Sequence, residues 1–229
     1  METMLIEAAV GAHAPGCIVL LPGAMQGLED FRRAGFDRAL RQRRLPFELL
    51  LAAPAPAHLS DRSWIEALWR QVIEPQRQRR RRLWLGGISL GAFRALRFAA
   101  EFPQGIDGLC LLAPYLGSRI VAAEVARCAS LRDWQPGTLA AEDDERRVWA
   151  YVRDLRPPAP EVFVGLGRDD RFADTQRLLA RALPASSRVE VDGGHDWPVW
   201  RQLWGMFLDR QPQRAHEAML ALPVPPIPS

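Results

Sequence analysis

Short runs of apolar residues recur along the chain and are separated by more polar segments. These runs are residues 17–21, 47–51, 83–85, 108–112, 161–166 and 188–191, and most end at or shortly before a proline, glycine or aspartate. A run that is apolar at nearly every position is typical of a strand covered on both faces, as in a parallel sheet. Residues 4–10 predict one further strand, antiparallel and at the edge of that sheet.

Segments with helical periodicity lie between the apolar runs. They cover residues 31–43, 60–75, 90–102, 175–183 and 198–210. Because strands and helices alternate, the pattern predicts an α/β fold, with a mainly parallel sheet flanked by helices. In such a sheet the ligand site lies beyond the carboxyl ends of the strands, so the loops that follow the apolar runs are where chemistry is expected.

One interval departs from this alternation. Between residues 116 and 155 two helical stretches, 118–131 and 141–155, follow one another with no strand between them. We predict that this insertion lies across the strand ends as a small helical lid. Residues 1–210 then form a single domain of ordinary size, and the proline-rich residues 211–229 form an extended tail.

The composition excludes several classes of protein. Apolar residues make up 48% of the chain and charged residues 25%, which gives no reason to expect disorder across its body. No apolar run approaches the roughly 18 residues of a transmembrane helix, so no membrane span is expected. The first ten residues carry acids and no basic segment, which argues against a secretory signal. We therefore expect a cytoplasmic protein.

The three cysteines, Cys17, Cys110 and Cys128, lack the spacing of metal ligands or of a disulfide framework. Cys17 and Cys110 fall within apolar runs, where a thiol behaves as a small buried hydrophobic group. An odd number of cysteines without a secretory signal fits a reducing compartment. No metal site is expected.

All 30 positively charged side chains are arginines, against 27 acidic ones, so the net charge is only +3. The densest arginine run, residues 77–82, invites a nucleic-acid interpretation. It follows a predicted helix with Trp64, Leu68 and Val72 on one face, and it lacks the interleaved aromatic and glycine residues of a phosphate-binding track. We therefore expect a solvated loop and no nucleic-acid partner.

The apolar run 83–85 leads into the sequence Gly87-Ile88-Ser89-Leu90-Gly91 and from there into a helix. A serine at such a strand-to-helix turn has its hydroxyl clear of the backbone. A side chain at Gly87 or Gly91 would collide with the neighbouring strand or helix. Ser89 is therefore the candidate nucleophile, and at neutral pH it needs a base and a third group that orients the base.

His195 is the candidate base. It follows the last apolar run directly after Gly193 and Gly194, which allow a sharp turn that projects the imidazole over the strand ends. The other histidines stand at less suitable places: before the first core run, in a loop rich in proline and alanine, and in the tail. They are His13, His58 and His216.

The acid is expected from the loop after the run 161–166. Asp170 lies three residues beyond Gly167, which leaves room for a turn that brings its carboxylate under the imidazole. Asp169 is the alternative, and one of the two is expected to serve only the turn.

The order serine, acid, histidine, each in a loop that follows an apolar run, resembles the α/β-hydrolase family over about residues 15–210. The resemblance implies an oxyanion hole with one backbone amide from Leu90, the residue after the nucleophile. It implies a second amide from the loop after residue 21, for which Met25 is preferred and Ala24 is the alternative. Many members have His-Gly where this chain has Pro22-Gly23, so that choice stays open. The Met25 side chain is also expected to line the pocket.

The resemblance further implies a serine hydrolase that cleaves a carboxylic ester or thioester of a small to medium acyl substrate, without a cofactor. Tyr115, Trp134 and Trp149 lie in or beside the predicted lid and are candidates for the substrate pocket. An acyl thioesterase of a biosynthetic pathway is the nearest alternative. A hydrolase fold that serves only for binding is an alternative of a different class.

Overall fold

In the computed structural model, residues 1–7, 14–60, 63–79, 81–140, 142–156 and 159–211 are described. Seven strands form one sheet in the order β1-β3-β2-β4-β5-β6-β7. They are β1 (Glu2–Ile6), β2 (Gly16–Leu21), β3 (Phe47–Ala53), β4 (Arg82–Ile88), β5 (Gly108–Leu112), β6 (Glu161–Gly167) and β7 (Arg188–Val191). Every neighbouring pair is parallel except β1 and β3. The predicted α/β fold with its mainly parallel sheet is confirmed.

The antiparallel edge strand is also present, but it begins earlier than predicted. β1 covers residues 2–6, whereas the apolar pattern indicated residues 4–10, of which 8–10 lie outside the described residues. β1 pairs with β3 from Glu2 opposite Ala53 to Ile6 opposite Leu49.

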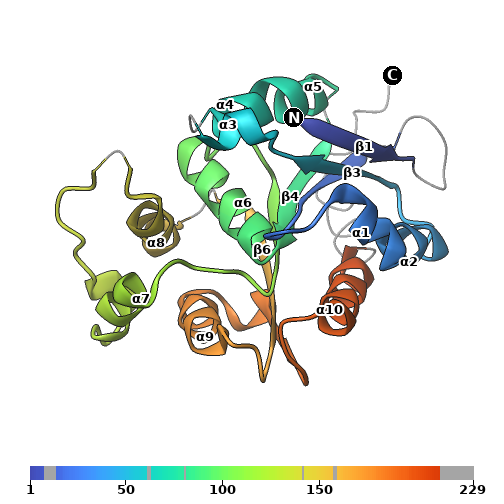
Figure 1. The fold of residues 1–229 in the computed structure, drawn as a ribbon. Helices are drawn as coiled ribbons and strands as arrows, with labels where there is room; N and C mark the ends of the chain where they lie inside the picture. Colours follow the sequence, from blue (N-terminus) through green and yellow to red (C-terminus); the bar gives the residue numbers. More distant parts are fainter. Residues whose placement is uncertain (8–13, 61–62, 80, 141, 157–158, 212–229) are drawn as a thin grey trace, which may run out of the picture.

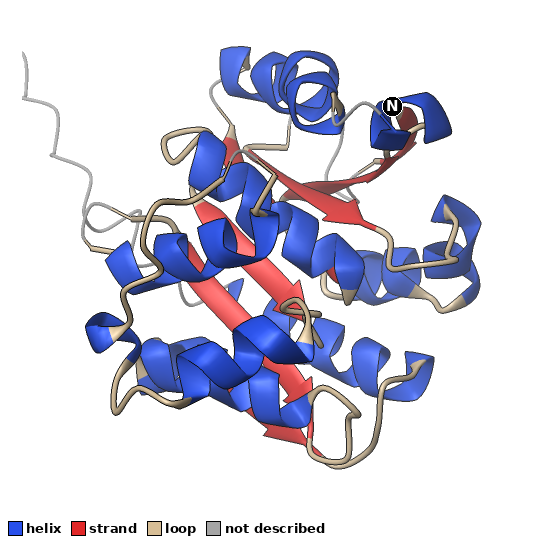
Figure 2. Cartoon of the chain, turned by 60° about the vertical axis from the view of Figure 1, so that its left-hand side comes forward, coloured by secondary structure: helices blue, strands red, loops and turns tan. Residues whose placement is uncertain are grey.

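Helices cover both faces of the sheet, which is why β2 and β5 are buried at every position (Figures 1 and 2). One face packs against α1 (Leu28–Arg33), α2 (Phe36–Gln42) and α10 (Trp197–Asp209). The other packs against α4 (Trp64–Leu68), α6 (Leu90–Glu101), α8 (Asp144–Asp154) and α9 (Ala173–Ala182).

Two predicted helices are divided. The segment predicted as one helix over residues 31–43 breaks at Gly35, whose φ of 81° ends α1 and starts α2. The segment predicted over residues 60–75 consists of α3 (Pro56–Ser60), α4, a π-helical turn (Trp69–Ile73) and α5 (Glu74–Gln78). Pro75 stands in the first turn of α5, directly after the π-helical turn, and has no N–H to donate to the preceding turn.

The insertion between β5 and β6 contains α7 (Arg119–Ala126), a short 3₁₀ turn (Leu131–Asp133) and α8. α8 lies beside α6 and joins its helical layer, with Arg97 Nε donating to Asp144 Oδ1 at 2.7 Å, while α7 lies farther out (Figure 1). That the segment acts as a lid stays a prediction. The predicted tail lies outside the described residues apart from Gln211.

The arginine run 77–82 differs from the expected solvated loop. Arg81 is buried, and its guanidinium forms an ion pair with the equally buried carboxylate of Glu48. Arg77 pairs with Asp107 at 3.1 Å, and Arg82 pairs with Glu161. A buried guanidinium needs a carboxylate partner, so Arg81 serves the packing at the amino ends of β3 and β4 rather than a solvated surface.

Cys17 and Cys110 are buried, as predicted, and all three cysteines are free thiols. Burial is the main cause that raises the pKa of Cys17 to about 12, and it also raises the pKa of Cys110. Within the described part of the chain, every helix is too short or too polar to cross a bilayer.

The carboxyl end of β2 passes very close to the turn between β4 and α6. A Cβ atom added at Gly87 or at Gly91 would overlap the carbonyl oxygen of Leu21. The predicted need for glycine at both positions is therefore confirmed. Because no side chain intervenes, the loop after β2 lies directly against the start of α6.

This close approach gives a test with a matched control. Gly91 and Gly205 both lie in helices, where Gly→Ala stabilises by about 1 kcal/mol on helix propensity alone. At Gly205 the nearest atom to an added Cβ is Arg43 Nη2, at 3.3 Å, on a flexible side chain. We expect Gly205→Ala to be neutral or stabilising and Gly91→Ala to lower the free energy of unfolding by about 1–3 kcal/mol. Urea unfolding followed by tryptophan fluorescence measures both, and equal effects would contradict the close approach.

Candidate active site

Ser89 stands at the carboxyl end of β4 in a strained backbone conformation, with φ 53° and ψ −114°. Its N–H donates to the Leu112 carbonyl oxygen at 3.0 Å, and its own carbonyl oxygen accepts from the N–H groups of Tyr115 (3.1 Å) and Phe93 (3.2 Å). These bonds join the serine to the end of β5 and to α6. They hold a φ that residues other than glycine rarely adopt.

The loops after β6 and β7 are joined to one another by backbone hydrogen bonds. Arg168 N donates to Val191 O at 2.8 Å, and Asp169 N donates to Gly193 O at 3.0 Å. Gly167 sits so close to the second loop that an added Cβ would lie 2.8 Å from Gly194 O. The two loops that carry the candidate acid and base therefore form one unit.

Ser89, His195 and Asp170 meet at this edge of the sheet. His195 Nε2 lies 2.9 Å from Ser89 Oγ, and His195 Nδ1 lies 2.6 Å from Asp170 Oδ2. The three side chains come from the loops after β4, β7 and β6, and they form a continuous chain of hydrogen bonds. This is the geometry in which a histidine can take a proton from the serine while a carboxylate orients the ring.

The Asp170 carboxylate is buried but well provided with donors. Oδ1 accepts from Phe172 N at 2.8 Å, and Oδ2 accepts from Gln176 Nε2 at 3.0 Å besides contacting His195. Burial raises the pKa of this carboxyl, but the hydrogen bonds from His195, Phe172 and Gln176 together outweigh it and leave the pKa below its usual range. Asp170 is therefore ionised at neutral pH.

Asp169 is placed differently. Its side chain is exposed, and its backbone N–H serves the contact between the two loops. Of the two carboxylates considered from the sequence, Asp170 is the one that the structure brings to His195.

Gln176 is a residue of the site that the sequence reasoning missed. It is fully buried in α9, and besides Asp170 its Nε2 contacts Pro114 O at 3.3 Å. The sequence does contain an indication that Gln176 has a polar partner. Gln176 is a polar residue on the face of α9 that is otherwise formed by Ala173, Leu179 and Ala180. A buried amide on an apolar helix face needs a polar partner, which here is Asp170.

Two aromatic rings enclose the imidazole. Phe172 and Trp200 each meet the His195 ring edge-on at a centroid distance of 5.1 Å. Trp200 is buried in α10 and also borders the histidine. The rings limit the orientations that His195 can adopt.

The candidate oxyanion donors lie on either side of the close approach between β2 and α6. Leu90 begins α6, and Ala24 and Met25 form the turn after β2. Within the described part of the chain, the backbone amides of Leu90 and Met25 donate to no protein acceptor, whereas Gly23 N donates to Gln26 Oε1 at 2.9 Å. The expectation that the Met25 side chain lines the pocket is wrong, because it is fully exposed to solvent.

Of the three aromatic residues proposed for the pocket, the structure places Tyr115 beside open space. Tyr115 borders two cavities, of about 620 and 530 Å³. Trp134 and Trp149 are instead buried, and neither borders the two cavities beside Tyr115. Their indole N–H groups donate to Glu124 Oε1 (2.9 Å) and Leu116 O (3.1 Å), so both rings are part of the packing around α7 and α8.

The remaining candidates lie elsewhere. His58 Nδ1 contacts Ser63 Oγ at 2.8 Å, and His13 and His216 lie outside the described residues. Among the residues that the structure describes, no three side chains of histidine, cysteine, aspartate or glutamate converge as metal ligands would.

No protein-family model matches the chain. A curated relative is an acetyl esterase from Caldicellulosiruptor saccharolyticus, 23% identical over 151 residues. The match covers 57% of this chain and 54% of the relative, so the chain spans about half the length of that protein.

Solved structures share the fold over nearly the whole chain. Est1E from Butyrivibrio proteoclasticus superimposes with a TM-score of 0.63 at 14% identity, covering 94% of both chains. The esterase domain of a Rhodothermus marinus protein has a TM-score of 0.60 at 15% identity, covering 91% of this chain and 96% of that one. An S-formylglutathione hydrolase from Staphylococcus aureus has a TM-score of 0.61 at 12% identity, covering 88% and 83%. With its strand order, the chain therefore has the α/β-hydrolase fold.

Proposed function

We propose that the protein is a serine hydrolase that cleaves a carboxylic ester or thioester, with Ser89 as nucleophile, His195 as base and Asp170 as the acid that orients the base. The observation that carries the proposal is the pair of contacts of His195, at 2.9 Å to Ser89 Oγ and 2.6 Å to Asp170 Oδ2. The similarity to an acetyl esterase supports the same class of reaction.

In the proposed reaction, His195 Nε2 takes the Ser89 proton as Oγ attacks the substrate carbonyl. His195 then donates that proton to the leaving oxygen or sulfur, which leaves an acyl-enzyme. A water molecule activated by His195 attacks the acyl-enzyme and releases the acid and free Ser89. Asp170 stabilises the imidazolium that forms in both halves of the reaction.

The tetrahedral oxyanion needs preorganised donors. The amide of Leu90 is the proposed first donor, and the amide of Met25 or of Ala24 the second. This assignment is supported by the close approach of Leu21 to Gly91, which keeps the β2 turn against the start of α6.

A thioester substrate is the second candidate. It is favoured by the likeness of the fold to S-formylglutathione hydrolases from Staphylococcus aureus and Agrobacterium tumefaciens, the latter with a TM-score of 0.56 at 13% identity. Acyl thioesters and aryl esters of matched acyl length distinguish the two candidates. The class of substrate that the enzyme prefers has the higher kcat/KM.

Labelling with a fluorophosphonate probe tests the nucleophile. We expect the wild type to be labelled and Ser89→Ala to be unlabelled, with kcat on an acetyl ester lowered by about 10⁶-fold. The matched control is Ser63→Ala, because Ser63 is also in contact with a histidine, His58, at 2.8 Å. Labelling retained in Ser89→Ala, or a folded wild type that resists the probe, would contradict the proposal.

Separate amide substitutions test the choice of acid. Asp170→Asn replaces the carboxylate on His195 Nδ1, so we expect kcat to fall by about 10⁴-fold. Asp169→Asn makes the same chemical change one residue away on an exposed side chain, and we expect little change in kcat. Steady-state kinetics with an acetyl ester measures both, and equal small losses would mean that another group orients the imidazole.

Gln176 is a positioning residue, and its role can be separated from its packing. Gln176→Leu removes a donor to Asp170, so we expect kcat to fall about tenfold with KM unchanged. Gln211→Leu is the control: Gln211 is also buried, donates to a backbone carbonyl (Phe207 O, 3.2 Å), and like Gln176 has an Oε1 without a partner among the described residues. Both variants alter stability, but only Gln176→Leu should alter kcat; similar kcat values would reduce Gln176 to a packing role.

A further inference from the structure

A groove between α7 and α9 begins beside the Ser89–His195–Asp170 network. Its first part is the cavity of about 620 Å³, which is lined by Tyr115 and Phe172 at one end and by Ala126 and Leu178 at the other. Phe172 contacts the His195 ring at 5.1 Å and the Tyr115 ring at 5.5 Å. α7 presents Ala122, Ala123 and Ala126 to the groove, and most of the lining surface is apolar. Arg119, Arg171 and Asp174 also border this first part.

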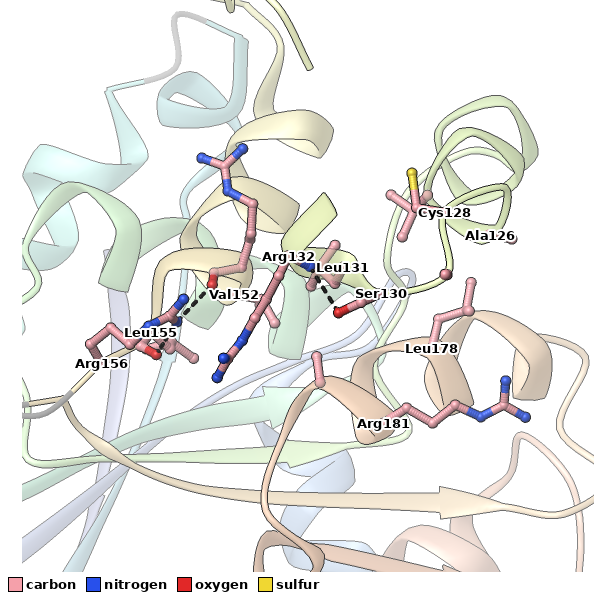
Figure 3. A pocket seen from close by; sticks show the side chains of 14 residues that line it. Ala126, Cys128, Ser130, Leu131, Arg132, Val152, Leu155, Arg156, Leu178 and Arg181 are labelled. Carbon is pink, nitrogen blue, oxygen red and sulfur yellow. Dashed lines mark hydrogen bonds between the residues drawn. The ribbon is translucent and has the colours of Figure 1, made fainter. Parts of the chain in front are cut away.

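A second cavity, of about 340 Å³, continues the groove away from the site. Ala126 and Leu178 line both cavities, so the two adjoin. Figure 3 shows the smaller one. Here the lining is more polar and includes arginines but no acidic residue, whereas the first cavity has Asp174 beside its two arginines. The arginines are Arg132, Arg153, Arg156 and Arg181.

Two of these arginines already bind acceptor groups within the chain. Arg153 pairs with Asp154 at 2.7 Å, and Arg156 Nη1 donates to the carbonyl oxygens of Arg153 (2.9 Å) and Leu155 (2.7 Å) at the end of α8. The guanidinium groups of Arg132 and Arg181, by contrast, have no acceptor within the described ranges. Figure 3 shows Arg132 on the 3₁₀ turn and Arg181 on α9, with their guanidinium groups directed away from one another. Both side chains are exposed, so they can rotate toward an anion in the cavity between their elements.

The length of the groove sets the length of that ligand. Phe172 precedes α9 and Arg181 lies in its last turn, about nine residues or about 14 Å away at 1.5 Å per residue. A molecule that reaches from the serine to the arginines must therefore be extended and apolar in its middle.

We propose that the α7–α9 groove binds a part of the substrate with an apolar body and a carboxylate or phosphate at its far end, which Arg132 and Arg181 hold. This inference rests on the proposed hydrolase function. Either the acyl group or the leaving group of the substrate can carry the anion, and both present the same chemistry to the groove.

Two series of esters of graded length test the proposal. The first compares aryl esters of monocarboxylic acids with aryl half-esters of dicarboxylic acids. The second compares acetate esters of plain alcohols with those of alcohols that carry a terminal carboxylate. In one of the two series, the wild type should have a higher kcat/KM for the longer anionic ester than for its neutral counterpart. Added salt should reduce this difference in kcat/KM. Arg132→Gln/Arg181→Gln should lower the ratio of kcat/KM for anionic over neutral esters about tenfold.

Two further variants complete the experiment. Ala126→Phe places a ring where the two cavities join, so the ratio of kcat/KM for long over acetyl substrates should fall. Arg127→Gln removes the same charge from the exposed end of α7 without lining either cavity, and it should keep the wild-type ratios.

The groove and the proposed function fail in different ways. The groove assignment alone is overturned if the wild type is labelled and turns over acetyl esters but prefers anionic esters in neither series. It is also overturned alone if the double variant keeps the wild-type preference for anionic esters. If the wild type shows neither labelling nor turnover, the proposed function is overturned and the assignment of the groove as a substrate site with it.

Discussion

The backbone of Ser89 is held in a conformation that costs about 1–3 kcal/mol, and the geometry of the whole site depends on it. With φ at 53°, the chain turns from β4 into α6 within one residue, and the hydroxyl stands at the sheet edge. The turn is possible because Gly87 and Gly91 let the Leu21 carbonyl approach. It persists because hydrogen bonds from Ser89 to the end of β5 and to α6 offset the strain.

The positions of His195 and Asp170 depend on a second set of contacts, which is independent of the turn at Ser89. Backbone hydrogen bonds join the loops after β6 and β7, and the buried carboxylate of Asp170 is stabilised by three donors rather than by a cation. Gln176 supplies one of these donors from α9 through its Nε2.

The insertion after β5 is where this chain departs from simple strand–helix alternation, and it surrounds the space next to the site. α8 is tied to α6 by the ion pair between Arg97 and Asp144, and Trp149 is buried beneath it. α7 instead faces α9 across alanines, which leaves a groove rather than a packed interface. On a fold that hosts many chemistries, such an insertion is the natural place for substrate preference to be encoded.

The sequence by itself determined the features that depend on residues close together along the chain. Continuous apolar runs identified six parallel strands, and the spacing of Gly87, Ser89 and Gly91 identified the strand-to-helix turn, because both are local patterns. The sequence also narrowed the base and the acid to His195 and to Asp169 or Asp170. It did so because loops at the carboxyl ends of parallel strands lie at one edge of the sheet.

Only the tertiary structure decided which groups meet. It brings Asp170 rather than Asp169 to the imidazole, adds Gln176 from α9, and turns the Met25 side chain to solvent. It also buries Trp134 and Trp149 in helix packing. These outcomes depend on how two loops or two helices approach each other at ångström precision. Hydrophobic periodicity specifies which face of an element is buried, but it does not specify the partner that covers that face.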